Sequence, residues 1–162
     1  MKDINQAHRD AEAGNVVDQG FLGWTYLYGR FTEVNYQEAL RWLSAAAYDG
    51  RASRPFIHLG RMYEEGLGVP QEIQEAIRHY RAVAKVEPRA TLALARIYAS
   101  GKGVPTDPAE AVRLYSLVAE HDTWEHDADV VAFAGAVTSD EVEEAKSTYA
   151  ITNDTARAAE RS

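Results

Sequence analysis

The sequence contains no cysteine and no apolar stretch long enough to cross a bilayer, and both absences narrow the class of protein. With no cysteine among 162 residues, disulfides, thiolate metal sites and cysteine nucleophiles are excluded. No apolar run approaches the roughly 18 residues that a membrane-spanning helix needs. Residues 1–15 are polar and charged, unlike a secretory signal. We therefore predict no membrane insertion and a cytoplasmic location, or a periplasmic one if a signal peptide has been removed.

Catalytic and cofactor-binding motifs are also missing. There is no Gly-x-Ser-x-Gly, no His-Glu-x-x-His and no phosphate-binding glycine loop followed by Lys-Ser or Lys-Thr. The stretch Gly101-Lys102-Gly103 has Gly66-Leu67-Gly68 at the equivalent place, so these glycines are interpreted as turn residues. We predict no enzyme activity, no cofactor and no metal.

Basic residues are outnumbered by acidic ones, 17 to 25, which gives a formal charge of −8. Nine carboxylates and no lysine or arginine lie between Glu120 and Glu144. This balance disfavours nucleic acid as a partner, because binding to phosphates needs a basic face. It favours a basic protein partner. The alternative is that the acidic surface only keeps the protein in solution.

What the sequence does contain is a repeat with a period of 37 and then 35 residues, marked by Tyr26, Tyr63 and Tyr98. Self-similarity at such a period is typical of stacked helical units. Other positions recur in the same register: Leu22, Leu59 and Leu94; Gly23, Gly60 and Ala95; Gly29, Gly66 and Gly101; Ala39, Ala76 and Ala111. We expect the small residues before each tyrosine to let two helices approach closely, opposite the recurring alanines.

Each repeat is predicted to hold two helices joined by a glycine loop. In the second repeat, residues 56–63 carry apolar side chains at i, i+3, i+4 and i+7, which is one helical face. Gly66-Leu67-Gly68-Val69-Pro70 then ends that helix and turns the chain. The glycines of this loop, and those of Gly101-Lys102-Gly103, are expected to adopt positive φ.

Capping residues mark where the second helices begin. Asp107 and Asn35 are predicted N-caps, each with a glutamate three residues later. Glu72 occupies the same place in the second repeat and is a poorer cap, so its helix should begin less sharply.

Taken together, these motifs resemble Sel1-like repeats, relatives of tetratricopeptide repeats. The match rests on Leu59-Gly60-Arg61-Met62-Tyr63 with Gly66-Leu67-Gly68-Val69, and on its counterparts from Leu22 and Leu94. It covers about residues 7–121. Phe31 and Thr32 depart from the pattern, so the geometry of the first loop is left open. The resemblance implies an all-α fold, a right-handed α-solenoid of about three helix-turn-helix repeats, in a family of adaptor and assembly proteins, mostly bacterial in short forms.

The expected organisation is a single repeat domain over residues 1–152 and a polar tail over 153–162. Within it, a partial N-terminal helix spans 3–14, and repeats span about 16–50, 52–87 and 88–121. Capping helices at 126–151 would cover the last apolar face. A repeat array with open ends can be a monomer or a homodimer.

In such helix pairs the first helices line the concave side, so that groove is the predicted partner-binding site. Trp, Tyr and Arg are the residue types enriched where binding energy concentrates. The candidate partner-binding residues are Trp24, Tyr28, His58, Arg61, Glu65 and Arg96. Alternatively, the arginines only pair with nearby carboxylates and Trp24 belongs to the core.

The leading hypothesis is a non-enzymatic protein-interaction module, and a sharper version is an immunity or inhibitor protein that masks a basic bacterial toxin or effector. Two alternatives remain from other classes. One is a metal-dependent hydrolase using the acidic and histidine-bearing segment His121–Asp129, although His121 and His126 are not spaced for one helix face. The other is a regulatory subunit that senses a small ligand in the groove.

Overall fold

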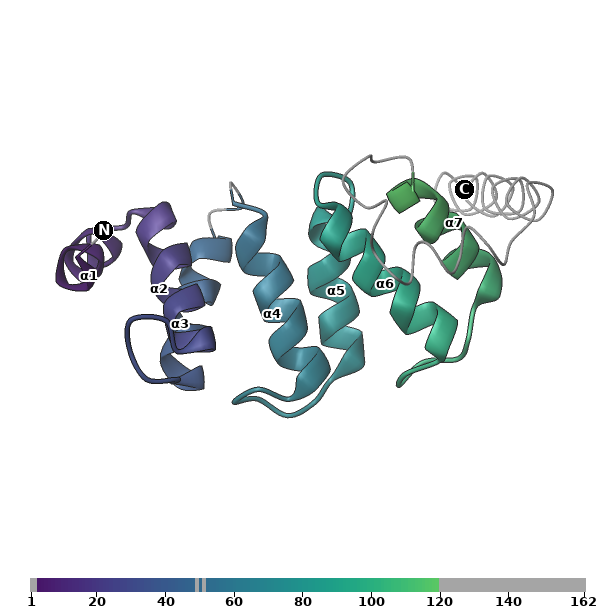
Figure 1. Cartoon of the computed structure of the whole chain (residues 1–162), viewed down its shortest axis with the longest axis horizontal. Coiled ribbons are helices and arrows are strands. Elements are labelled where there is room, and N and C mark those ends of the chain that lie inside the picture. Colours follow the sequence, from purple (N-terminus) through teal and green to yellow (C-terminus); the bar gives the residue numbers. More distant parts are fainter. Residues whose placement is uncertain (1–2, 49, 51, 120–162) are drawn as a thin grey trace, which may run out of the picture. The chain divides into compact units, whose positions relative to one another are not determined.

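The computed structural model describes residues 3–48, 50 and 52–119, and these residues form α-helices and loops without a strand (Figure 1). The chain divides into two compact units, Met1–Glu87 and Pro88–Ser162, which are treated separately below. The capping helices predicted at 126–151, the tail at 153–162 and the segment His121–Asp129 lie outside the described residues.

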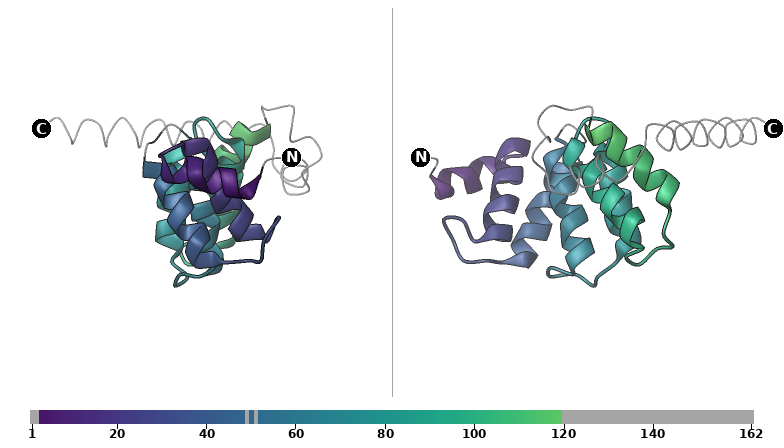
Figure 2. Two further views of the ribbon diagram at one scale, coloured as in Figure 1. Left: turned by 90° about the vertical axis from the view of Figure 1, so that its left-hand side faces the viewer. Right: turned by 45° about the vertical axis from the view of Figure 1, so that its right-hand side comes forward.

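The first unit consists of α1 (Ile4–Glu12), α2 (Val16–Tyr28), α3 (Tyr36–Tyr48), α4 (Arg54–Glu65) and α5 (Ile73–Val83). In this unit α2 packs against α3 and α4 against α5, while α1 packs on α2 and α3 on α4. The loop between α2 and α3 and the loop between α4 and α5 lie at the same end of the unit (Figures 1 and 2). In the second unit, α6 (Pro88–Ser100) packs against α7 (Pro108–Ala119). Each predicted repeat therefore contains the expected helix pair.

In the two helix pairs of the first unit, a glycine in the first helix accommodates a large side chain from the second. A Cβ added at Gly23 would lie 2.5 Å from Leu43 Cγ, and one added at Gly60 would lie 2.5 Å from Tyr80 Cε1. The expected close approach is confirmed, but the nearest side chains are Leu43 and Tyr80 rather than the recurring alanines. The larger residues fill the space because a helix without a Cβ at this point leaves a pocket in its surface.

Two apolar clusters join α1, α2, α3 and α4 in the first unit. One lies between α2, α3 and α4, and the other joins α1 to α2 and α3. The buried members of the first are Leu27, Ala39, Leu43, Leu59 and Met62, and those of the second are Ala7, Ala11, Leu22 and Trp42. Because successive helices share these clusters, each pair completes the core of its neighbour within the unit.

The three glycine loops follow one backbone path. The N–H of Asn35 donates to Tyr26 O at 2.9 Å, that of Glu72 to Tyr63 O at 2.9 Å and that of Asp107 to Tyr98 O at 3.0 Å. Gly29, Gly66 and Gly101 adopt φ of 65°, 70° and 68°, and the positive φ predicted for the glycines of the second and third loops is confirmed. The departure at Phe31 does not change this path. Its φ is 68°, next to 70° and 66° for the equivalent Gly68 and Gly103.

The expected caps are present where the residue type favours them. Asn35 accepts from the N–H of Glu38 at 3.1 Å, and Asp107 accepts from the N–H of Glu110 at 3.0 Å. Glu72 precedes α5 with extended backbone and makes no side-chain cap bond. The prediction of a poorer cap for α5 is therefore confirmed. Across the described residues, no helix combines the length and hydropathy that crossing a membrane requires.

Candidate functional site

One face of α2 carries a row of aromatic rings. Phe21, Trp24 and Tyr28 are three and four residues apart, which places them on the same side of the helix. The ring centroids of Phe21 and Trp24 are 6.3 Å apart, and those of Trp24 and Tyr28 are 6.2 Å apart. Trp24 is half-buried rather than part of the core. The buried tryptophan of this unit is Trp42, which is 3% exposed.

The row continues from α2 onto α4 through Tyr28. The Tyr28 hydroxyl lies 3.3 Å from Nδ1 of His58, and the two rings meet edge to face with centroids 5.6 Å apart. Arg61, one turn further along α4, donates from Nη1 to the same hydroxyl at 3.1 Å. Its guanidinium also lies 5.3 Å from the centroid of the Tyr28 ring. Tyr28 thus links α2 to α4, which are the first helices of the two pairs in this unit.

Glu65 completes the arrangement by orienting Arg61. Nε of Arg61 donates to Oε1 of Glu65 at 2.8 Å, and Nη2 donates to Oε2 at 3.4 Å. The hydrogen bond to Glu65, opposed by partial desolvation and assisted by Tyr28, raises the pKa of Arg61 above its ordinary value. Such a pair adds little to the stability of the fold because both side chains are exposed. Its effect is to hold a charged, planar group in one orientation.

Five of the six predicted residues therefore form one connected surface, here called the α2/α4 surface. Its members are Trp24, Tyr28, His58, Arg61 and Glu65. The pairing expected for one arginine is also present, as Arg61 is bound to Glu65. Arg96 is exposed on α6, in the second compact unit, and is therefore described separately from the other five.

Two further aromatic residues extend this surface and were not among the predicted ones. Phe21 precedes Trp24 by one turn, and the ring of Phe31 lies 6.4 Å from that of Phe21. The spacing of Phe21 from Trp24 could have identified it. Phe31 was recognised only as a departure from the repeat, and its place beside Phe21 depends on the loop conformation. We call Phe21 and Phe31 the aromatic extension.

The pair α4 and α5 holds a different aromatic cluster. His79 stacks on Tyr63 with centroids 5.5 Å apart and planes 15° apart, and its ring also lies 6.1 Å from Phe56. Burial lowers the pKa of His79, with a smaller lowering from Arg78 and an opposing effect of Glu75. The hydroxyl of Tyr80 donates to Glu64 at 2.9 Å.

These groups provide contact surfaces and hydrogen-bond donors. Within residues 3–48, 50 and 52–119, no three His, Asp or Glu side chains come together in a way that would hold a metal ion. The partly exposed rings, the oriented guanidinium and the tyrosine hydroxyl are groups that bind a surface by packing and directional bonds.

A scan of known families matches this chain in three places. The Sel1 repeat model matches residues 19–50, 57–85 and 88–122, which together make up more than half of the chain. The three matches coincide with the three helix pairs.

Relatives by sequence include much longer proteins. Protein sel-1 homolog 2 of Rattus norvegicus is 35% identical over 83 residues, which cover 51% of this chain and 12% of that protein. DAP3-binding cell death enhancer 1 of Mus musculus is 35% identical over 74 residues, covering 46% of this chain and 14% of the relative. The chain therefore spans only about an eighth of the length of these relatives.

Solved structures show the same fold. A protective antigen present in uropathogenic Escherichia coli strains, with an SLR fold, is 34% identical with a TM-score of 0.69, covering 74% of this chain and 26% of the antigen. A Sel1 repeat protein from Oxalobacter formigenes is 32% identical with a TM-score of 0.63, covering 82% of this chain and 96% of that one. The fold is therefore an all-α solenoid, and the chain belongs to the Sel1 repeat family.

Proposed function

We propose that this chain binds a protein partner through the α2/α4 surface, without catalysing a reaction. The observation that carries the proposal is the bridging role of Tyr28, which contacts Trp24 on its own helix and His58 and Arg61 on α4. Sel1 repeat proteins generally mediate protein–protein interactions, and one relative is named for binding DAP3. These two facts support a protein rather than a small molecule as the ligand.

The contacts of Arg61 make it suited to recognition. A free arginine side chain loses considerable rotational freedom when a partner immobilises it. Here Glu65 and Tyr28 already hold the guanidinium in place. Trp24 and Tyr28 supply large rings with little conformational freedom to lose. A partner that docks on this surface therefore meets groups that are ordered before binding, and this lowers the entropic cost of association.

The sharper form of the proposal is that the partner is a basic bacterial toxin or effector and that this chain acts as its immunity or inhibitor protein. The formal charge of −8 on 162 residues supports a basic partner, because opposite net charges raise the association rate. Co-expression with each candidate toxin encoded beside the gene tests this form directly. Restored growth of the toxin-expressing cells is the expected result, and failure to bind or neutralise any of them would refute the immunity role.

Affinity capture, with the wild type and matched variants as baits, tests the general proposal that a protein partner binds the α2/α4 surface. Trp24→Ala and Arg61→Glu each alter the α2/α4 surface, whereas Arg78→Glu changes an exposed arginine on α5 that pairs with Glu75. All baits are checked for helix content by circular dichroism. A partner retained by the wild type and by Arg78→Glu, and lost from the other two, is the expected outcome.

Arg96→Glu is compared separately because Arg96 lies in the second unit. Equal retention by the wild type, Trp24→Ala and Arg61→Glu would refute the α2/α4 surface as the binding site. In that case, baits with charge reversals among the carboxylates between Glu120 and Glu144 show whether the partner binds the acidic segment instead.

A further inference from the structure

Phe31 has a backbone conformation that an L-residue rarely adopts. Its φ of 68° lies in the left-handed region, and it is the single non-glycine residue with positive φ among those the structure describes. The equivalent positions of the other two loops hold Gly68 and Gly103, with φ of 70° and 66°. Glycine reaches this region without steric cost, whereas a side chain at this point brings its Cβ close to the following carbonyl oxygen.

Packing does not explain why this position holds phenylalanine. The side chain is 63% exposed, so it contributes little to the core of the first unit. A strained residue that persists without a structural reason commonly marks a functional site. The ring has one aromatic neighbour in the unit, Phe21, which in turn lies beside Trp24. Phe31 therefore prolongs the aromatic row beside Phe21, at the end away from Tyr28.

We propose that Phe31 is a partner-binding residue and that the aromatic extension, together with Trp24, receives an arginine-bearing segment of a basic protein partner. The inference rests on the proposed function, because it assumes that the neighbouring α2/α4 surface is the docking site. Phe31 is thus interpreted as the specificity residue that distinguishes the first repeat loop from the other two.

The chemistry of the surface favours a cation. The faces of aromatic rings carry partial negative charge and attract guanidinium groups, most strongly at tryptophan. The first unit already forms this contact twice within itself, since the Arg61 guanidinium lies 5.3 Å from the Tyr28 centroid and that of Arg41 lies 4.4 Å from the Trp42 centroid. An arginine of the partner on Trp24 or Phe31 would repeat that geometry.

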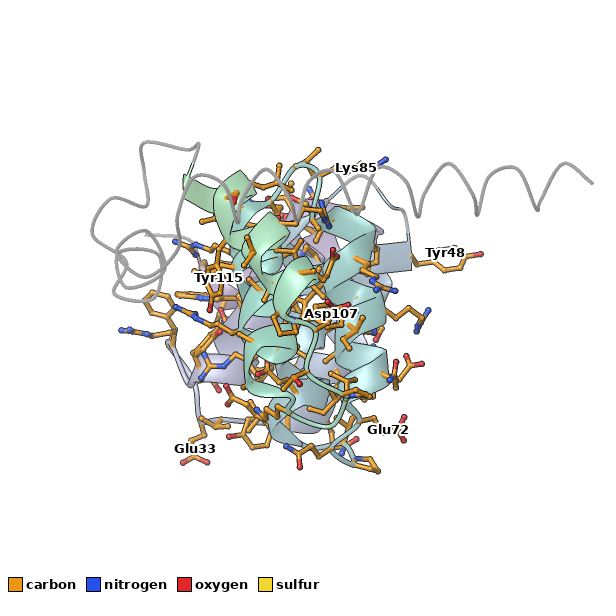
Figure 3. All side chains as sticks on the ribbon, turned by 90° about the vertical axis from the view of Figure 1, so that its right-hand side faces the viewer. Glu33, Tyr48, Glu72, Lys85, Asp107 and Tyr115 are labelled. Atoms are coloured by element: carbon orange, nitrogen blue, oxygen red, sulfur yellow. The ribbon has the colours of Figure 1, made fainter. Side chains whose placement is uncertain are left out.

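The charges around the extension are compatible with a basic segment. Arg30 and Glu33 are both exposed on either side of Phe31, and Glu33 points outward from the loop (Figure 3). These two charges offset each other locally. At the other end, the charge of Arg61 is balanced by Glu65. The unit that bears the surface, residues 1–87, has twelve Asp and Glu residues against ten Lys and Arg residues, and this slight acidity agrees with a positively charged partner.

The test is a selection of short randomised peptides displayed on phage against the full chain, followed by affinity measurement on synthetic peptides. Peptides enriched on the wild type are expected to carry arginine. Each selected peptide is then measured against Phe31→Gly and Phe31→Tyr, and with each arginine replaced by lysine or glutamate. We expect Phe31→Gly to weaken binding by about tenfold and Phe31→Tyr to bind within about threefold of the wild type. Glutamate in place of arginine should weaken binding further than lysine does.

Fold integrity is read from the same variants. Phe31→Gly relieves the left-handed strain, so its midpoint of thermal unfolding should not fall below that of the wild type. A loss of affinity with unchanged or higher thermal stability then does not come from a destabilised fold.

The outcomes separate this inference from the proposed function. Peptides that lose affinity on Trp24→Ala and Arg61→Glu but not on Phe31→Gly would overturn the inference and leave the α2/α4 surface standing. Peptides unaffected by all three would overturn both. Enrichment of acidic or proline-rich sequences without arginine, or no enrichment at all, would overturn the assignment of an arginine-bearing segment.

Discussion

The two loops of the first unit share a backbone path and differ in what surrounds their central residue. Residues 29–35 and 66–72 close with the same hydrogen bond, from Asn35 to Tyr26 and from Glu72 to Tyr63, both at 2.9 Å. In the second loop, a Cβ on Gly68 would collide with Cβ of Tyr36 at the start of α3. In the first loop, Phe31 projects into solvent. The helix ends and the closing bond therefore impose the left-handed conformation, whereas packing decides whether a side chain fits there.

The largest effect on stability is expected when the phenylalanine of the first loop is placed at the equivalent position of the second loop. Gly68→Phe adds left-handed strain and forces Tyr36 away from the start of α3. We expect a loss of about 3 kcal/mol or more in the free energy of unfolding, from strain and overpacking together. Urea denaturation measures it. Phe31→Gly is the matched control and should not be destabilised; equal losses in the two variants would show that the loops do not differ as described.

A second contrast concerns glycines within helices. Gly60→Ala places a methyl group 2.5 Å from Cε1 of Tyr80, so the pair α4 and α5 must separate or Tyr80 must move. We expect this variant to lose about 1–3 kcal/mol. Gly20→Ala on α2 is the control, because its nearest neighbour outside the helix is Cγ of Pro55 at 3.8 Å. It should gain up to about 1 kcal/mol from helix propensity. A stabilised Gly60→Ala would contradict the role of Gly60 in close helix packing.

The caps distinguish the beginnings of α3 and α5. Asn35→Ala removes the bond to the N–H of Glu38 and should cost about 1 kcal/mol. Glu72→Asn should instead gain about 0.5–1 kcal/mol, because Glu72 has extended backbone and makes no cap bond. Thermal unfolding of the two variants beside the wild type measures both effects. A destabilised Glu72→Asn would show that Glu72 contributes in another way.

The smallest expected effect is a pH dependence of the stability, which arises from His79 between α4 and α5. Burial lowers the pKa of His79 below its ordinary value of 6.5, so the unfolded chain takes up a proton more readily than the folded one. The stability that His79 contributes is therefore present above about pH 6.5 and is lost as the pH falls from there to its folded pKa. His79→Phe keeps a ring against Tyr63 and cannot titrate. Its melting temperature should fall less than that of the wild type between pH 8 and pH 5; an equal fall would assign the acid sensitivity to other groups.

Much of the fold could be predicted because its determinants are local. The recurring tyrosines, the loop glycines and the N-cap residues Asn35 and Asp107 all act within a few residues of their own position. Their periodicity indicated helix pairs, and the structure confirms the pairs, the positive φ and the caps. The packing around Gly60 was predicted less well, because its neighbour Tyr80 is chosen by the angle between two helices rather than by sequence spacing.

The candidate site was predicted only in part, because some of its contacts are local in the sequence and others are not. Helical spacing is sufficient to place Trp24 and Tyr28 on one face of α2. It does not show that the Tyr28 hydroxyl reaches Arg61, 33 residues away, nor that the ring of Phe31 lies beside Phe21. Those contacts depend on the packing of α2 on α4 and on the path of the first loop.

The amino-acid sequence by itself determined that this protein is a helical repeat, because hydrophobic period, glycine loops and caps are written in each repeat and act locally. Tertiary structure alone decided that Tyr28 links the two first helices and that Phe31 keeps a glycine's conformation with its ring exposed. The first requires residues 33 positions apart to contact each other, and the second depends on what packs around the loop; neither is encoded by a local pattern.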